Sequence, residues 1–225
     1  MSGALAVFDL DGTITCSDTM GPFLWGYLWR HPWRLLRIVP AMGAPVMFLL
    51  NRDRGALKGA AIRAILGGVA RPRLEQWAER FVSQLIPQGL FAEALQAIAR
   101  HRAAGDRLLL MSASTDLYVP RIGRALGFDE VICTRVRWRA DGRLDGRLAN
   151  TNCRGEEKRR CLAEVLAREP SDRVYAYGNS GSDLDHMVLA NEAFLINAPA
   201  HLTRVPSPQL QAVRWHERAA ATSTF

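Results

Sequence analysis

The chain has 225 residues, of which 48% are hydrophobic and 23% are charged, and its formal net charge is +7 at pH 7. This length can bury a complete core, so we expect one domain with an insert, and the composition excludes a disordered or fibrous protein. The positive charge favours an anionic partner, but charge alone does not distinguish phosphate esters, an anionic membrane surface and nucleic acid.

The cysteines are spread along the chain without a CxxC pair, at Cys16, Cys133, Cys153 and Cys161. This spacing indicates neither a zinc site nor a disulfide framework, so reduced thiols are expected. The N-terminus lacks the basic stretch and apolar stretch that are typical of a secretory signal. We therefore expect a cytoplasmic protein.

The first predicted element is a strand over residues 5–8, which is followed at once by acidic residues. Its unbroken apolar run is typical of a strand that is covered on both faces of a parallel sheet. Residues two apart on an extended chain point the same way, so Asp9 and Asp11 should face one spot, and Gly12 lets the chain turn. Carboxylates this close indicate a cation or a proton between them; the alternative is a solvated acidic turn.

A stretch rich in Trp and Arg follows over residues 23–50. Its uncharged part, residues 38–50, contains Pro40 and Pro45 and is shorter than the ~20 residues that a membrane-spanning helix needs. Basic residues flank it on both sides, which is not the one-sided bias of a spanning helix. Two interpretations stay open: core-facing helices of a helical insert, or an interfacial element whose Trp rings and Arg groups lie at lipid headgroups.

The rest of this region has helical periodicity and leads into the first αβ unit. Apolar residues recur with helical spacing over residues 57–85, interrupted at residues 71–72. A helix over residues 91–103 and a strand over residues 108–111 follow, and this strand ends at Ser112. Such an alternation of helix and strand builds parallel sheets.

The next segment combines a helix, a strand and a hairpin. A helix is predicted over residues 116–126, where Pro120 should cause a kink unless it lies in the first turn. Residues 131–134 are predicted to form a strand. Residues 136–148 alternate around Asp141-Gly142, which indicates a β-hairpin.

The last predicted elements again place polar residues after strands. A helix carries Lys158 in its first turn, and a strand over residues 174–177 is followed by a polar loop with Asn179 and Asp183. A short helix and a final strand over residues 194–196 complete the pattern, and the tail beyond shows no usable period.

Four other residues receive no functional role from the sequence. His186 and Asp185 are predicted to be exposed on a helix, and Tyr118 and Trp138 are assigned to packing.

The polar residues at or just after strand ends form a set suited to phosphoryl transfer, since ligands of open parallel sheets bind beyond the carboxyl ends of the strands. A carboxylate can act as the nucleophile, a second can donate a proton and then activate water, and a hydroxyl and a lysine can hold phosphate oxygens. A hard divalent cation on carboxylate oxygens can neutralise the developing charge. The set consists of Asp9, Asp11, Ser112, Lys158, Asn179 and Asp183.

At these residues the chain resembles the haloacid dehalogenase superfamily of aspartate-nucleophile phosphatases, in the phosphoserine-phosphatase-like branch, subfamily IB. The first motif of that family, DxDGT, is similar to residues 9–13, and its second, a strand ending in Ser or Thr, to residues 109–114. The lysine motif is similar to residues 152–158, and the acidic loop motif to residues 177–183. The four motifs stand in the family's order and together cover residues 5–197.

The resemblance implies a role for each matching residue. Asp9 would be the nucleophile and would form an aspartyl phosphate, and Asp11 would be the general acid and base. Ser112 and Lys158 would bind the transferring phosphoryl group, and Ser114 is a rival for the role of Ser112. We prefer Ser112 because it directly follows the predicted strand.

The same resemblance implies a Mg²⁺ site and shows one departure from the family. Asp9, the backbone carbonyl of Asp11, Asn179 and Asp183 would hold the ion. The family usually has Asp at the position of Asn179. An amide oxygen still binds Mg²⁺ but brings no charge, so we expect weaker affinity or a larger contribution from Asp183.

The resemblance also implies the architecture: an α/β fold with a Rossmann-like parallel sheet flanked by helices, and a helical cap of the C1 type inserted after the first strand. We expect residues 1–16 and 88–225 to form the catalytic core and residues 17–87 to form the cap.

The cap selects the substrate in this family, and the apolar stretch here is similar to the cap of the phosphatidylglycerophosphatase C type. This favours a phosphatase for a lipid or amphiphilic phosphate, with peripheral contact between the cap and the inner face of the membrane. The alternative is a phosphatase for a soluble, phosphoserine-like metabolite. A third hypothesis is a basic membrane- or nucleic-acid-binding protein with a relic site, although no nucleic-acid motif is present, so no nucleic-acid partner is expected.

Overall fold

The protein is described by a computed structural model over residues 3–37, 54–203, 209–216 and 218–219. The uncharged run at residues 38–50 therefore lies outside the described residues. The strands of the main sheet are β1 (Leu5–Phe8), β2 (Arg107–Thr115), β3 (Glu130–Thr134), β6 (Val174–Gly178), β7 (Glu192–Ile196) and β8 (Leu210–Val213).

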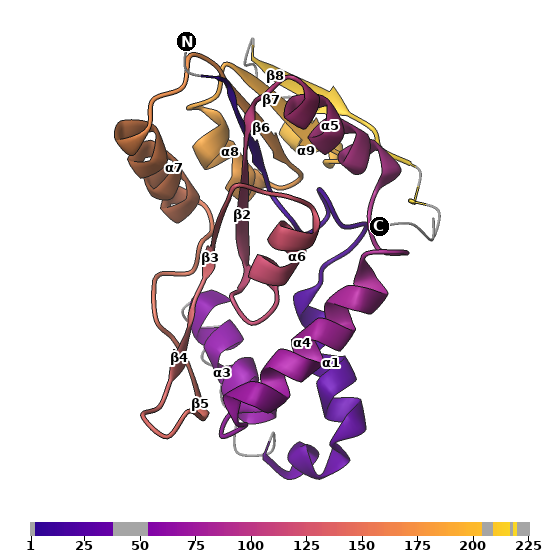
Figure 1. Ribbon diagram of the computed structural model, residues 1–225, viewed down its shortest axis with the longest axis vertical. Coiled ribbons are helices and arrows are strands. Elements are labelled where there is room, and N and C mark those ends of the chain that lie inside the picture. Colours follow the sequence, from indigo (N-terminus) through magenta and orange to yellow (C-terminus); the bar gives the residue numbers. More distant parts are fainter. Residues whose placement is uncertain (1–2, 38–53, 204–208, 217, 220–225) are drawn as a thin grey trace.

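These strands form one sheet in the order β3-β2-β1-β6-β7-β8, and each neighbouring pair runs parallel (Figure 1). Strand β1 is central, because β2 and β6 pair with it on either side. The predicted α/β class with a parallel sheet is confirmed.

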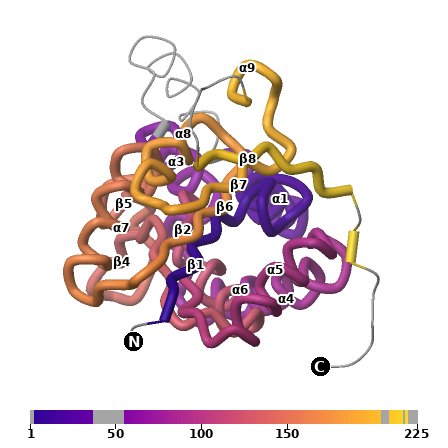
Figure 2. Tube along the Cα trace, turned by 90° about the horizontal axis from the view of Figure 1, so that it is seen from above, coloured from indigo at the N-terminus to yellow at the C-terminus, as the bar shows by residue number. Residues whose placement is uncertain are grey.

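Helices cover both faces of the sheet, with α5 (Ala92–Ala103) and α6 (Val119–Ala125) on one face and α7 (Glu156–Arg168) and α8 (Gly181–Met187) on the other. Figure 2 shows α5 and α7 on opposite sides of β1 and β2. Alternate side chains of β1 belong to two separate hydrophobic cores. Ala6 and Phe8 pack toward α5 and α6, and Leu5 and Val7 pack toward α7 and α8. The prediction of a strand buried on both faces is confirmed.

A group of helices between β1 and α5 lies below the carboxyl ends of the strands in Figure 1. We call it the insert, and it consists of α1 (Met20–Arg30), the 3₁₀ helix η1 (Pro32–Arg37), α3 (Arg54–Leu66) and α4 (Arg71–Leu85). Phe23 and Tyr27 on α1 are buried, and the Nε1 of Trp77 on α4 donates a hydrogen bond to the backbone carbonyl of Phe23 at 3.2 Å. In the described part of the Trp-rich stretch, one face of α1 is therefore core, as the first interpretation predicted.

The hairpin formed by β4 (Val136–Trp138) and β5 (Leu144–Leu148) confirms the prediction made from Asp141-Gly142. It packs against the insert, since the backbone of Leu144 exchanges hydrogen bonds with Gly68 and Val69 at 2.8 and 2.9 Å. Gly146, with φ +90°, lies so close to α3 that an added Cβ would be 2.5 Å from the Cα of Arg63. The hairpin thus joins the insert although it comes from the second half of the chain.

Three details differ from the sequence analysis or refine it. Pro120 lies in the first turn of α6, where it disturbs no helical hydrogen bond. The tail that shows no period contains α9 (Ala200–Thr203) and the edge strand β8. None of the described helices combines the length and the apolar character needed to cross a membrane.

Candidate active site

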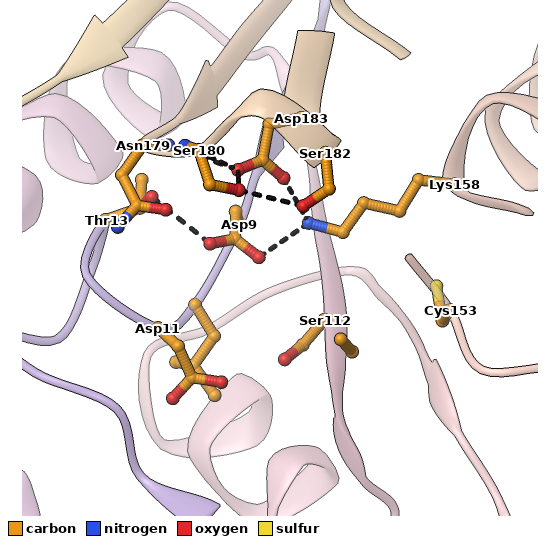
Figure 3. Close-up of polar contacts among 12 residues, drawn as sticks. Asp9, Asp11, Thr13, Ser112, Cys153, Lys158, Asn179, Ser180, Ser182 and Asp183 are labelled. Carbon is orange, nitrogen blue, oxygen red and sulfur yellow. Dashed lines mark hydrogen bonds and ion pairs between the residues drawn. The ribbon is translucent and has the colours of Figure 1, made fainter. Parts of the chain in front are cut away.

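A buried ion-pair network stands at the carboxyl end of β1 (Figure 3). The Nζ of Lys158, in the first turn of α7, donates hydrogen bonds to Asp9 Oδ1 at 2.6 Å and to Asp183 Oδ1 at 2.7 Å. Thr13 Oγ1 donates to Asp9 Oδ2 at 3.2 Å. The side chains of Lys158 and Asp183 are each only 2% exposed. Residues from three distant parts of the sequence are therefore held in direct contact.

Burial raises the pKa of Asp9 to about 7, and the neighbouring carboxylates of Asp183 and Asp11 raise it further, while Lys158 opposes them. Two carboxylates therefore share one ammonium group, and Asp9 is the one whose ionised form is disfavoured. A cation or the positive phosphorus centre of a phosphate ester would stabilise ionised Asp9.

The other two members of the network are held in their charged forms. Burial alone would raise the pKa of Asp183, but the Lys158 ammonium and the hydrogen bonds to its carboxylate lower it below its usual value. Burial would likewise lower the pKa of Lys158, and the carboxylates of Asp183 and Asp9 raise it instead. Asp183 and Lys158 thus form a fixed charge pair beside Asp9.

Asp11 belongs to a separate hydrogen-bonded cluster. Thr19 donates to Asp11 Oδ1 through its backbone N–H at 2.8 Å and its hydroxyl at 2.6 Å, and Ser114 Oγ donates to Oδ2 at 2.6 Å. Burial raises the pKa of Asp11, and the hydrogen bonds from Ser114 and Thr19 partly offset this effect. A carboxyl group with a raised pKa and fixed orientation is suited to donating a proton.

The two serines of the second motif have different environments. Strand β2 continues to Thr115, so Ser112 lies within the strand, and the reason given for preferring it, that it follows the strand, is wrong. Ser112 is fully buried and its Oγ accepts the backbone N–H of Ser114 at 3.0 Å. The Ser114 hydroxyl donates its hydrogen bond to Asp11. The Ser112 hydroxyl still has its own proton to donate.

A tight turn brings the first and fourth motifs together. Gly12 has φ +76°, and a Cβ added there would lie 2.0 Å from Asn179 Nδ2. Only glycine fits this position, because it tolerates the backbone conformation and leaves room for the Asn179 side chain. Asp183 is fixed by Ser180, whose backbone N–H and hydroxyl donate to Asp183 Oδ2 at 3.0 and 2.7 Å.

One cavity of about 500 Å³ brings together five of the predicted site residues: Asp9, Asp11, Lys158, Asn179 and Asp183. Ser114 also lines it, whereas the fully buried Ser112 is not among the lining residues. In the described part of the chain, no three His, Cys, Asp or Glu side chains converge to hold a metal by themselves. A Mg²⁺ site here would also need the amide oxygen of Asn179 and the backbone carbonyl of Asp11. Such oxygen donors are the ligands that Mg²⁺ prefers, so the residues present fit this ion.

Two groups that support the site were not predicted from the sequence. Thr19, fully buried, orients Asp11, and the hydroxyls of Thr19 and Tyr118 are 2.9 Å apart. Tyr118 therefore does more than pack. No periodic pattern marks Thr19, because a single Thr before a helix resembles an ordinary N-cap.

Two cations that face the cavity were likewise not predicted from the sequence. Lys58 on α3 and Arg154 before α7 both line it. Lys58 Nζ donates to the backbone carbonyl of Ala113 at 2.5 Å and to Asn152 Oδ1 at 2.8 Å. Burial, together with nearby Arg154, lowers the pKa of Lys58 to about 8, against the opposite influence of Asp11. A motif search focuses on the core segments and so does not find a lysine contributed by the insert.

The prediction that His186 is exposed is wrong, whereas Asp185 is exposed as predicted. His186 is fully buried because α8 packs against α7, and neither of its ring nitrogens has a hydrogen-bond partner among the described residues. Burial and the Lys158 charge lower its pKa to about 3, although Asp183 opposes them. His186 is therefore neutral.

Comparisons with known sequences identify the family of the chain. The sequence model of haloacid dehalogenase-like hydrolases matches residues 6–187. Protein CicA of Caulobacter vibrioides is 36% identical over 190 residues, which cover 84% of this chain and 83% of that protein. The probable phosphatase Rv3661 of Mycobacterium tuberculosis is 27% identical over 207 residues, which cover 90% of this chain and 71% of that protein.

Solved structures show the same fold. A protein of unknown function from Bordetella pertussis has a TM-score of 0.74 at 23% identity, covering 95% of this chain and 99% of that one. A probable phosphoserine phosphatase from Vibrio cholerae has a TM-score of 0.71 at 15% identity, covering 95% of this chain and 61% of that one. At these identities the structures support the fold and carry no information on the substrate.

Proposed function

The chain belongs to the haloacid dehalogenase-like hydrolase family, and we propose that it is a phosphatase that transfers the phosphoryl group of a phosphomonoester first to Asp9 and then to water. The observation that supports this proposal best is the arrangement around Asp9. One buried carboxylate contacts Lys158 at 2.6 Å, while a second acid, Asp11, is fixed separately in the same cavity.

In the first step a carboxylate oxygen of Asp9 attacks phosphorus, and the bond from phosphorus to the leaving oxygen breaks. Asp11 gives its proton to that leaving oxygen, so the alcohol departs neutral. Lys158 and the Ser112 hydroxyl donate hydrogen bonds to the phosphoryl oxygens and stabilise the charge that develops on them.

In the second step water attacks phosphorus of the aspartyl phosphate, and the bond from phosphorus to Asp9 breaks. Asp11, now ionised, takes the proton of the attacking water. Phosphate leaves, and Asp9 is restored as a carboxylate while Asp11 is restored as an acid. The raised pKa of Asp11 suits a group that must carry a proton at the start of each cycle.

We further propose that Asp9, the Asp11 carbonyl and Asn179 hold Mg²⁺, with Asp183 supplying negative charge beside it. When bound, this ion neutralises charge on the phosphoryl oxygens. Asn179→Asp adds a carboxylate to the ligands, so we expect it to retain or improve Mg²⁺ affinity, by roughly three- to tenfold. Calorimetric titration with Mg²⁺ measures this, and a marked loss of affinity would contradict the assignment.

The experiment that tests the proposed reaction is phosphate release from p-nitrophenyl phosphate in the presence of Mg²⁺. We expect Asp9→Asn to lower the rate by at least about a thousandfold. Asp141→Asn removes the same charge at the exposed hairpin turn and should leave the rate unchanged. A binding protein with a relic site would release no phosphate in either case.

A second observation favours a lipid or amphiphilic phosphate as the substrate. Large apolar side chains on α1 and η1 are exposed, by 60% to 78% for four of the five; this aromatic surface consists of Trp25, Trp29, Trp33, Leu35 and Leu36. Arg30, also exposed, follows Trp29 in the chain, and its guanidinium lies over the ring of Trp77 at 4.9 Å. Aromatic rings with neighbouring cations are typical of surfaces that lie at anionic lipid headgroups. We propose that the aromatic surface brings the insert to a membrane, where the substrate is presented.

Vesicle sedimentation tests this second part. We expect the full chain to sediment with vesicles of phosphatidylglycerol and phosphatidylcholine, and less with vesicles of phosphatidylcholine alone. Turnover of a lipid phosphate in such vesicles should then exceed turnover of phosphoserine. If the protein stays in the supernatant and prefers phosphoserine, the soluble-metabolite alternative holds and the phosphatase proposal is unaffected.

A further inference from the structure

Two cations of the cavity have no task in the proposed phosphoryl transfer. Lys58 comes from α3 of the insert and Arg154 from the loop before α7, so they approach the cavity from different parts of the fold. The proposed reaction uses Lys158 and Ser112 for the phosphoryl oxygens. Lys58 and Arg154 are therefore available for another part of the substrate.

Lys58 lies on the side of the cavity where the leaving group must be. Its Nζ contacts the carbonyl of Ala113 at 2.5 Å, and the next residue, Ser114, holds the proposed general acid Asp11. Since Asp11 protonates the leaving oxygen, groups beside Asp11 face the leaving group rather than the transferring phosphoryl group. Lys58 is thus in a position to contact the leaving group.

The position of the Lys58 ammonium group is fixed by the protein, and part of it remains available. Asn152 Oδ1 accepts from Lys58 at 2.8 Å and from Thr134 Oγ1 at 3.1 Å, so the acceptor is itself oriented. An ammonium group has three N–H donors, and the contacts among the described residues use two of them. The third donor can bind a ligand in the cavity.

Arg154 supplies a second charge close to the first. Its guanidinium is near enough to Lys58 to disfavour the lysine's charged form, and it is only half-buried. Among the described residues, no hydrogen bond from the Arg154 side chain is found. Two cations that repel each other at the wall of a cavity are stabilised when an anion binds between them.

We propose that Lys58 and Arg154 form a subsite for a second anionic group on the substrate, carried by the leaving group. The substrate class is then a phosphomonoester whose alcohol bears a carboxylate, a phosphodiester or another phosphate. This inference rests on the proposed phosphatase function and names the substrate class of that site. The insert contributes one of the two cations, so binding of such a leaving group also holds the insert against the core.

Binding of paired phosphonates tests the subsite without any turnover. Propylphosphonate and 3-phosphonopropanoate have equally long chains, but only the second carries a carboxylate, and butylphosphonate with 4-phosphonobutanoate extends the comparison by one carbon. We expect calorimetry with Mg²⁺ to show at least tenfold tighter binding of the carboxylate member of one pair. Equal affinities within both pairs would overturn the proposal.

Variants show whether the preference depends on these side chains. Lys58→Gln and Arg154→Gln should each reduce the preference for the carboxylate member at least fivefold, and Lys58→Arg should keep most of it. Arg80→Gln removes an exposed cation of α4 outside the cavity and should keep the full preference. A preference that survives both Gln variants, in protein shown to be folded by circular dichroism, would overturn the proposal.

Kinetics separate this inference from the proposed function. Phosphate release is compared for propyl phosphate and 1,3-propanediol bisphosphate. We expect Lys58→Gln to lower the kcat/KM of the bisphosphate relative to that of propyl phosphate at least tenfold, mainly by raising the KM of the bisphosphate. If Lys58→Gln reduces both substrates equally, the subsite is wrong while the phosphatase stands. If neither substrate is hydrolysed in an Asp9-dependent manner, the proposed function is wrong, and the calorimetric comparison still decides the subsite.

Discussion

The active-site end of the sheet and the aromatic surface of the insert use their side chains in opposite ways. At the site, Lys158 and Asp183 are almost completely buried and each is paired with another charge. On the aromatic surface, Trp29 is 76% exposed and Leu36 is 78% exposed. The comparison suggests that changes at the site alter stability and chemistry together, whereas changes on the aromatic surface alter association alone.

The largest effect should come from Lys158→Met, which leaves Asp9 and Asp183 buried without their cation. We expect the free energy of unfolding to fall by about 3–5 kcal/mol, since breaking a buried ion pair leaves uncompensated charge. Urea denaturation in the presence of a chelator measures this. Arg159→Met removes a neighbouring exposed cation of the same helix and should cost less than about 1 kcal/mol. Similar losses in both variants would break the contrast between site and surface.

A somewhat smaller effect should follow the ionisation of Asp9. Its pKa is about 7 in the folded protein and 3.8 ordinarily, so the folded state holds the proton more tightly. The stability that protonated Asp9 contributes is present below pH ~4 and is lost as the pH rises toward about 7.

Comparing metal-free wild type with Asp9→Asn from pH 4 to pH 8 tests this sign. The wild type should lose about 2–4 kcal/mol relative to the variant across this range, since each pKa unit is worth about 1.4 kcal/mol. Asp141→Asn, at an exposed carboxylate, should show no such trend. A wild type that gains stability relative to Asp9→Asn as the pH rises would contradict the raised pKa.

Glycine substitutions separate the turn at the site from an ordinary surface turn. Gly12 and Gly142 have similar φ values, +76° and +72°, but only at Gly12 does another side chain occupy the space of a Cβ. Gly142→Ala should lower the free energy of unfolding by about 1 kcal/mol, because only the strained backbone conformation of the alanine destabilises the variant. Gly12→Ala should cost at least about twice as much and should weaken the Mg²⁺ response by displacing Asn179. Equal costs would show that the contact with Asn179 is unimportant.

The smallest effect on stability should come from the aromatic surface. Trp25 and Trp29 are exposed, so changing both to Ala should alter the free energy of unfolding by less than about 1 kcal/mol while vesicle sedimentation falls several-fold. Trp77→Ala, in the buried core of the insert, should cost about 3–5 kcal/mol. A double variant that still sediments with anionic vesicles would remove the main support for a membrane surface.

Local patterns in the sequence predicted much of the fold. The apolar run before Asp9 predicted the buried central strand, and Asp141-Gly142 predicted the hairpin, because both signals depend on neighbouring residues. The edge strand β8 was missed, since its residues are only half-buried or exposed and alternate weakly. His186 was misplaced for a related reason: the side of α8 that packs on α7 depends on a segment about 25 residues earlier.

For the site, the sequence by itself determined which chemical groups follow the strands, because the type and order of residues there are local properties of the chain. Only the tertiary structure decided which of these groups touch: Lys158 joins Asp9 and Asp183, Ser114 goes to Asp11, and Lys58 reaches the cavity from the insert. Such contacts depend on how helices and strands pack over long separations, and side-chain pairing across that distance leaves no periodic signal in the sequence. The protonation states at the site likewise depend on burial and on the neighbouring charges that oppose it, and the folded protein alone imposes both on Asp9 and Lys158.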